Sequence, residues 1–97
     1  MALDAQWFTE IEHQDFMAFS LRVRAKLHEE QSSFQKIEVW DTAGFGRLMV
    51  IDGCTMVSTL ENFLYHEMMS HPVLYAHAAP RDVAIIGGGD CGTLREV

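Results

Sequence analysis

A glycine-rich run close to the end of the sequence has the composition of a loop that binds a nucleotide or nucleoside. Residues Gly87 to Gly92 match the pattern G-x-G-x-x-G, after an apolar run at Val83–Ile86 and before a helix start at Thr93–Val97. Glycines in that context permit a tight turn and let the backbone approach a ligand closely. A purely structural glycine turn remains the alternative, because the acidic residue that usually supports the motif would lie about 20 positions further on, beyond Val97.

Asp90 narrows the class of ligand that this loop could bind. The residue follows Gly89 directly, and a carboxylate at the start of a helix stays ionised because backbone N–H groups and the helix dipole favour its charge. A phosphate docked about 4 Å away would be repelled by roughly 4 kcal/mol at an effective dielectric constant of about 20. The sequence therefore disfavours NAD and ATP and favours a cationic ligand, with simple helix capping by Asp90 as the alternative.

The run His66-Glu67 followed by His71 resembles a zinc-protease motif but lacks its spacing. HExxH requires the second histidine at position 70, where this sequence has Ser70. Five residues of helix place the two histidines about 140° apart, so they cannot share one ion. We expect no metal site.

The segments before this region predict antiparallel strands. Hydrophobic and polar residues alternate over Ala18–Leu27, so Phe19, Leu21, Val23, Ala25 and Leu27 would share one face. Further strands are expected at Phe34–Trp40, Arg47–Ile51 and Cys54–Val57, with Asp52-Gly53 as a two-residue hairpin turn between the last two.

A helix and the start of a second domain are expected after these strands. Ser58 and Glu61 have the spacing of a capping box, so a helix should run from about Glu61 to His71 and end or kink at Pro72. Val83–Ile86 is continuously apolar, as in a parallel strand buried on both faces. We therefore expect an amino-terminal antiparallel β-domain at 1–59, a helix and connector at 60–80, and the start of an α/β domain at 81–97.

Composition excludes several classes of protein. The 97 residues contain seven Lys and Arg against fourteen Asp and Glu, a net charge of −7. Nucleic acid is an unsuitable partner for such a surface, whereas a small cation such as a polyamine would be attracted. The two cysteines, Cys54 and Cys91, fit reduced thiols, and the absence of an apolar run of about 20 residues predicts no membrane span. We expect a cytoplasmic location.

Taken together, these residues resemble the spermidine synthase family of aminopropyltransferases. The resemblance rests on Tyr65-His66-Glu67-Met68-Met69, on Ile85-Ile86-Gly87-Gly88-Gly89-Asp90 and on Thr93-Leu94-Arg95-Glu96-Val97. Trp7 with Glu10, Phe34-Gln35, Phe45-Gly46-Arg47 and Asp52-Gly53 follow the same order and spacing upstream, so the resemblance covers essentially the whole chain.

The resemblance implies transfer of an aminopropyl group from decarboxylated S-adenosylmethionine, a co-substrate, to putrescine, with no further cofactor. It implies a β-domain followed by a Rossmann-like, methyltransferase-type domain of which only the first strand and helix start are present, and usually a homodimer. Asp90 would hold an amine, and Gln35 would hydrogen-bond the nucleoside donor. His66 would line the polyamine site, Tyr65 would help to place the attacking nitrogen, and the nucleoside loop would comprise Gly87, Gly88 and Gly89.

Some positions depart from the family pattern. Met56 stands where the family usually has Gln, Ser58–Asn62 is less acidic, and Cys91 replaces a glycine, so cadaverine or another diamine stays open as the acceptor. The general base is expected beyond Val97. The chain alone is therefore expected to be inactive and to need the missing carboxy-terminal segment or a second copy. The alternatives are a non-catalytic β-domain that serves oligomerisation, and a putrescine methyltransferase-like relative.

Overall fold

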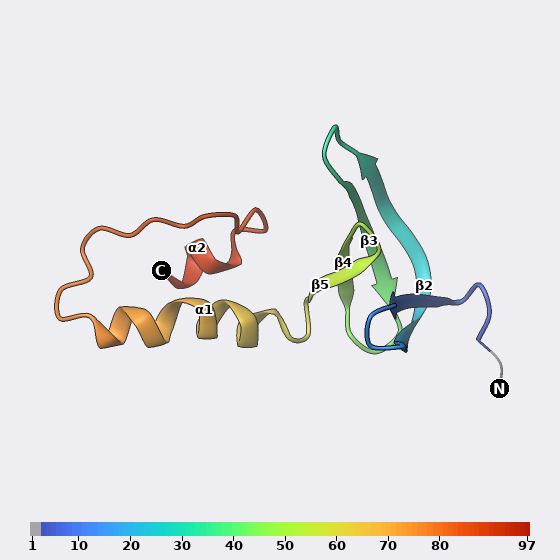
Figure 1. The fold of residues 1–97 in the computed structure, drawn as a ribbon, viewed down its shortest axis with the longest axis horizontal. Helices are drawn as coiled ribbons and strands as arrows, with labels where there is room; N and C mark the ends of the chain where they lie inside the picture. The colour runs from blue at the N-terminus through green and yellow to red at the C-terminus, as the bar shows by residue number, and fades with distance from the viewer. Residues whose placement is uncertain (1–2) are drawn as a thin grey trace. The chain divides into compact units, whose positions relative to one another are not determined.

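A computed structural model describes residues 3–97 of the chain (Figure 1). Contacts divide the chain after Leu60 into a β-domain and a second unit formed by residues 61–97. The expected connector at 60–80 and the expected domain start at 81–97 therefore belong to one unit, apart from Leu60.

The β-domain is a single antiparallel sheet in which every strand pairs with its neighbour in the sequence. Its order is β1 (Trp7–Glu12), β2 (Met17–Gln31), β3 (Lys36–Thr42), β4 (Arg47–Ile51) and β5 (Cys54–Ser58). The expected antiparallel β-domain is confirmed. Strand β1 is not among the predicted strands. Its hydrophobic residues lie on both faces, with Phe8 in the core and Ile11 59% exposed, so the segment has no alternating pattern.

The turn at Asp52-Gly53 joins β4 to β5 as predicted. Asp52 has φ 51° and Gly53 has φ 81°, the left-handed backbone that a tight two-residue hairpin requires. Asp52 also accepts a hydrogen bond through Oδ1 from the Lys36 backbone N–H, at 2.8 Å. The turn is therefore tied to the start of β3 as well as to its own strands.

The prediction that one face of β2 is apolar throughout is wrong after Val23. Val23 pairs with Thr42 and Lys26 pairs with Trp40, so two β2 residues three positions apart share a face. Irregular pairing between Val23 and Ala25, and again between Lys26 and His28, inserts an extra residue each time and changes which side chains face the core. Lys26 consequently lies with its Nζ 4.8 Å from the centre of the Trp40 ring.

The core of the β-domain is small. It consists of Phe8, Val23, Leu48 and Val50, with Leu21 and Trp40 packed against it. The rings of Phe8 and Trp40 lie 6.0 Å apart between centres, which brings β1 over β3. The sheet therefore curls so that its first strand covers part of its own inner face.

The second unit contains α1 (Asn62–Ala76) and α2 (Gly92–Glu96). The predicted capping box is wrong, because Ser58 is the last residue of β5 and Glu61 occupies the N-cap without a side-chain capping bond. The helix also continues past Pro72 to Ala76. Pro72 removes only the bond to the carbonyl of Met68, whose residue is 69% exposed, so water can take that carbonyl's hydrogen bond.

No strand forms at Val83–Ile86 within the described residues, contrary to the prediction. A parallel strand exists only when a neighbouring strand accepts its hydrogen bonds. Within residues 3–97 all strand pairing is among the five strands of the β-domain, so Val83–Ile86 has no neighbour. The helix start expected at Thr93–Val97 is present as α2. Neither helix in the described part of the chain has the length and apolar character needed to cross a bilayer.

Candidate functional site

The Asp90 carboxylate is held at both of its oxygens. The backbone N–H of Gly92 donates to Oδ1 at 3.1 Å, and Nε2 of His66 lies 2.8 Å from Oδ2. One contact comes from the start of α2 and the other from the middle of α1. The carboxylate is therefore fixed between two elements while its side chain remains 23% exposed.

These contacts keep Asp90 ionised. Partial burial acts to raise the pKa of Asp90, but the hydrogen bonds from Gly92 and His66 outweigh it and lower that pKa below the ordinary 3.8. An ionised carboxylate that retains access to solvent can bind a cationic ligand.

His66 reaches Asp90 from a buried position on α1. Only 6% of its side chain is exposed, and the Ser70 hydroxyl donates to its backbone carbonyl at 2.7 Å. Tyr65 stands edge-on to the imidazole with 5.7 Å between ring centres, and is itself 55% exposed. His66 therefore contacts both Tyr65 and Asp90, and the roles of these residues in ligand binding stay a prediction.

Gly92 packs against the face of His66. A Cβ atom at this position would lie 1.9 Å from Cε1 of the imidazole and 2.2 Å from both ring nitrogens. No side chain fits there while His66 contacts Asp90. Sequence reasoning missed this contact, although the last glycine of G-x-G-x-x-G is known to permit close packing.

The glycine loop itself is open and left-handed. Gly87 has φ 84° and Gly88 has φ 66°, conformations that favour glycine. A Cβ at Gly87 or Gly89 would meet no atom within 4 Å. Cys91, which replaces a glycine of the family pattern, has φ 63°, an uncommon conformation for a residue with a side chain.

A second histidine of α1, His71, contacts a carboxylate that does belong to α2. Nε2 of His71 lies 3.3 Å from Oε2 of Glu96, and Tyr75 stands edge-on to the His71 ring. His66 and His71, the two histidines of the sequence run that resembles a zinc-protease motif, thus contact different carboxylates. Together they fasten α2, and with it the glycine loop, along α1.

Gln35 belongs to the β-domain rather than to this unit. It closes the β2–β3 hairpin, where its backbone N–H donates to Ser32 Oγ at 3.0 Å and its carbonyl accepts from the Ser32 N–H at 2.9 Å. Its side chain is half-buried. Its contact with a nucleoside stays a prediction.

Two family models match the chain and meet after residue 61, one residue beyond the boundary between its two units. The model described as the spermidine synthase tetramerisation domain matches residues 6–61. The model described as the spermine/spermidine synthase domain matches residues 62–97.

Curated relatives and solved structures agree with these models. A polyamine aminopropyltransferase of Thioalkalivibrio sulfidiphilus is 70% identical over all 97 residues, and one of Methylococcus capsulatus is 70% identical over 95. The chain spans about a third of the length of these relatives, 34% and 33%.

Two spermidine synthase crystal structures share the fold. One, in complex with the transition-state analogue AdoDATO, matches 99% of this chain and 33% of its own, with a TM-score of 0.90 and 32% identity. The other, from Thermotoga maritima, matches 93% of this chain and 31% of its own, with a TM-score of 0.88 and 34% identity.

Proposed function

This chain belongs to the spermidine synthase family, and from that premise we propose that it works within a protein of its relatives' length that transfers an aminopropyl group to putrescine. The donor is decarboxylated S-adenosylmethionine, and no further cofactor takes part. The observation that supports this proposal is the ionised Asp90 carboxylate, held at both oxygens beside an open glycine loop.

Asp90 selects between donors by charge. Decarboxylated S-adenosylmethionine has no carboxylate and ends in a cationic amine, which an ionised Asp90 attracts. Ordinary S-adenosylmethionine adds a carboxylate to that end, and at about 4 Å the repulsion from Asp90 would be on the order of 4 kcal/mol at an effective dielectric constant near 20. The same charge disfavours a pyrophosphate ligand.

The reaction requires one proton to leave the acceptor amine. The amine nitrogen forms a bond to the aminopropyl carbon while the carbon–sulfur bond breaks, and sulfur keeps the electron pair as a neutral thioether. An amine with a lysine-like pKa near 10.4 must first become neutral, which costs roughly 4–5 kcal/mol at pH 7. Asp90 is assigned to binding, and we assign the base to no residue of this chain.

The remaining residues have positioning and binding roles in this proposal. Tyr65, exposed beside His66, helps to place the attacking nitrogen, and Gln35 hydrogen-bonds the nucleoside. The acceptor is a diamine, with putrescine as the first choice and cadaverine as the main alternative, because Met56 replaces the usual Gln.

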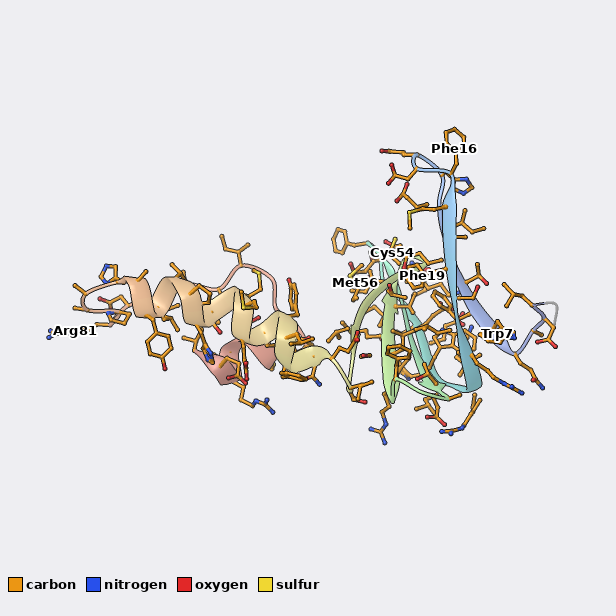
Figure 2. All side chains as sticks on the ribbon, turned by 90° about the horizontal axis from the view of Figure 1, so that it is seen from below. Trp7, Phe16, Phe19, Cys54, Met56 and Arg81 are labelled. Carbon is orange, nitrogen blue, oxygen red and sulfur yellow. The ribbon has the colours of Figure 1, made fainter. Side chains whose placement is uncertain are left out.

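The β-domain supplies contacts between copies in the same proposal. Residues 6–60 of this domain all lie within the match to the tetramerisation-domain model, which covers residues 6–61. Phe16, at the end of the β1–β2 hairpin, is 96% exposed and extends away from the sheet, and Ile11 on the same hairpin is 59% exposed (Figure 2). Apolar side chains this accessible are suited to burial against a second copy.

The test of the proposed activity uses the protein of full family length. Incubation with putrescine and decarboxylated S-adenosylmethionine should give spermidine and methylthioadenosine, detected by mass spectrometry, while the 97-residue chain alone should give neither. Cadaverine in a parallel reaction identifies the acceptor. N-methylputrescine formed from ordinary S-adenosylmethionine, or no transfer at all, would contradict the proposal.

A further inference from the structure

We propose that Ser32 and Asp52 are positioning residues, which hold the backbone on either side of Gln35 so that its side-chain amide is presented to the nucleoside donor. The identity of the ligand rests on the proposed function. The arrangement of the three residues does not, because all of their contacts lie within the β-domain.

The side chain of Ser32 organises the tip of the β2–β3 hairpin. Its Oγ accepts hydrogen bonds from the backbone N–H of Phe34 at 3.1 Å and from that of Gln35 at 3.0 Å. The same hydroxyl donates to the Gln35 carbonyl at 3.0 Å, and the Ser32 N–H donates to that carbonyl at 2.9 Å. Both backbone groups of Gln35 therefore have their partner in a single residue.

Asp52 holds the residue that follows Gln35. Its Oδ1 accepts a hydrogen bond from the Lys36 N–H at 2.8 Å, and its own backbone N–H donates to the Lys36 carbonyl at 2.9 Å. Because Asp52 belongs to the β4–β5 turn, these two bonds tie the hairpin tip to a separate part of the sheet. The backbone is thus restrained before Gln35 by Ser32 and after it by Asp52.

Hydrogen-bond capacity distinguishes Ser32 from the residue that it positions. A serine hydroxyl has one donor and two acceptor lone pairs, and Ser32 uses all three within the hairpin. The Gln35 side chain is half-buried, and its amide has no hydrogen bond to any of residues 3–97. An amide offers two N–H donors and an acceptor oxygen, so Gln35 can bind the hydroxyl groups of a nucleoside whereas Ser32 has no free group to offer.

The experiment measures the affinity of the full-length protein for methylthioadenosine, the nucleoside product of the proposed reaction, by calorimetry. Gln35→Leu removes the amide and should weaken binding by about tenfold, the upper range for one uncharged hydrogen bond. Ser32→Ala leaves the amide in place but less restrained, and should weaken binding by about fivefold. Asp52→Gly removes the carboxylate while permitting the left-handed backbone of the turn, and should have a similar effect.

Three further variants are the controls. Ser32→Thr keeps the hydroxyl and Asp52→Asn keeps an acceptor oxygen on a residue that suits the turn, so both should bind within about twofold of the original. Ser33→Ala deletes a hydroxyl from the neighbouring exposed position and should also change the affinity by less than about twofold. The calorimetric stoichiometry reports the folded fraction separately, because a variant that is only less stable loses binding sites and keeps its affinity.

A double variant tests whether Ser32 acts through Gln35. Ser32→Ala combined with Gln35→Leu should bind no more weakly than Gln35→Leu alone. Additive losses would mean that Ser32 affects binding by another route, and full affinity in Gln35→Leu would mean that the amide makes no contact. Either result overturns the proposal.

Hydrogen exchange tests the arrangement without a ligand. The backbone N–H of Gln35 should lose its protection in Ser32→Ala, and the backbone N–H of Lys36 should lose its protection in Asp52→Gly. Unchanged protection in both variants would refute the positioning roles. If the original protein does not bind methylthioadenosine, the proposed function fails, while this measurement still decides whether Ser32 and Asp52 fix the backbone around Gln35.

Discussion

Glu10 of β1 accepts two hydrogen bonds from Thr55 of β5, from its backbone N–H at 2.7 Å and from its hydroxyl at 2.6 Å. These strands stand at opposite ends of the strand order, and within residues 3–97 no ladder of backbone bonds joins them. The contact therefore fastens the curled sheet across its open side. Glu10, one of the residues on which the family resemblance rests, therefore has a structural role within the β-domain.

Removing the Thr55 hydroxyl should destabilise the β-domain. Thr55→Val keeps the shape of the side chain and the backbone contact but loses a hydrogen bond to a carboxylate, worth about 1.5–3 kcal/mol. Thr9→Val is the matched control, because the Thr9 hydroxyl lies on an exposed face and contacts the uncharged hydroxyl of Ser20, at 2.7 Å. Urea unfolding followed by the fluorescence of Trp7 and Trp40, both in the β-domain, measures the difference. Equal losses in the two variants would mean that the closing contact has no special weight.

Glu38 should stabilise the β-domain in a pH-dependent way. Burial acts to raise the pKa of Glu38, but Lys26 Nζ at 3.0 Å and Lys36 Nζ at 3.1 Å outweigh it and lower that pKa below 4.5. A lowered pKa in the folded state means that the stabilisation is present above the unfolded value and is lost as pH falls through the folded one.

Glu38→Gln should therefore cost about 1–2 kcal/mol near pH 7, a value reduced for the partly solvated lysines. The difference from the original chain should shrink as pH falls below about 4.5. Glu30→Gln is the control, since the Glu30 side chain is 71% exposed and its carboxylate contacts His28 instead of a lysine. A loss at pH 7 that persists undiminished at pH 3 would show that the effect comes from packing instead of charge.

Of two glycines in the β3–β4 turn, one should lose much stability on replacement by alanine and the other almost none. Gly46 has φ 72°, and a Cβ there would lie 1.9 Å from Thr59 Oγ1, an atom that accepts a hydrogen bond from the Arg47 N–H. Gly46→Ala should cost about 2–4 kcal/mol from left-handed strain and overlap together. A Cβ at Gly44 meets nothing within 4 Å, so Gly44→Ala should change stability by less than about 0.5 kcal/mol. Thermal unfolding of both variants would test this, and similar melting temperatures would contradict it.

Asp90→Asn in the full-length protein should weaken binding of the donor or of the amine by about 1.5–3 kcal/mol. The amide keeps the size of the side chain but removes the charge that attracts a cation. Asp82→Asn removes the same charge from an exposed position before the glycine loop and should leave both affinities unchanged. Calorimetry at pH 7 measures both. Because the pKa of Asp90 is lowered, the advantage of the original protein over Asp90→Asn should persist down to about pH 4 and disappear only below the lowered pKa.

Much of the fold could be predicted because its signals are local. The Asp52-Gly53 turn specifies a hairpin through the backbone angles of two residues, and β4 begins and ends where the apolar run Arg47–Ile51 does. The helix after residue 61 is present as predicted, although the capping box from which its start was inferred is not. The capping box at Ser58 misled because β5 takes that residue into the sheet, where it is buried.

The sequence by itself determined which elements carry the candidate residues, since Tyr65 and His66 adjoin in one helical segment and Asp90 follows the glycine loop before the next. Only the tertiary structure decided how they meet. The His66–Asp90 contact joins residues 24 positions apart, and the packing of Gly92 on the ring depends on how α2 lies along α1. The bulges of β2 and the Glu10–Thr55 contact are of the same kind, because pairing and closure depend on distant strands and leave no periodic signal in their own segments.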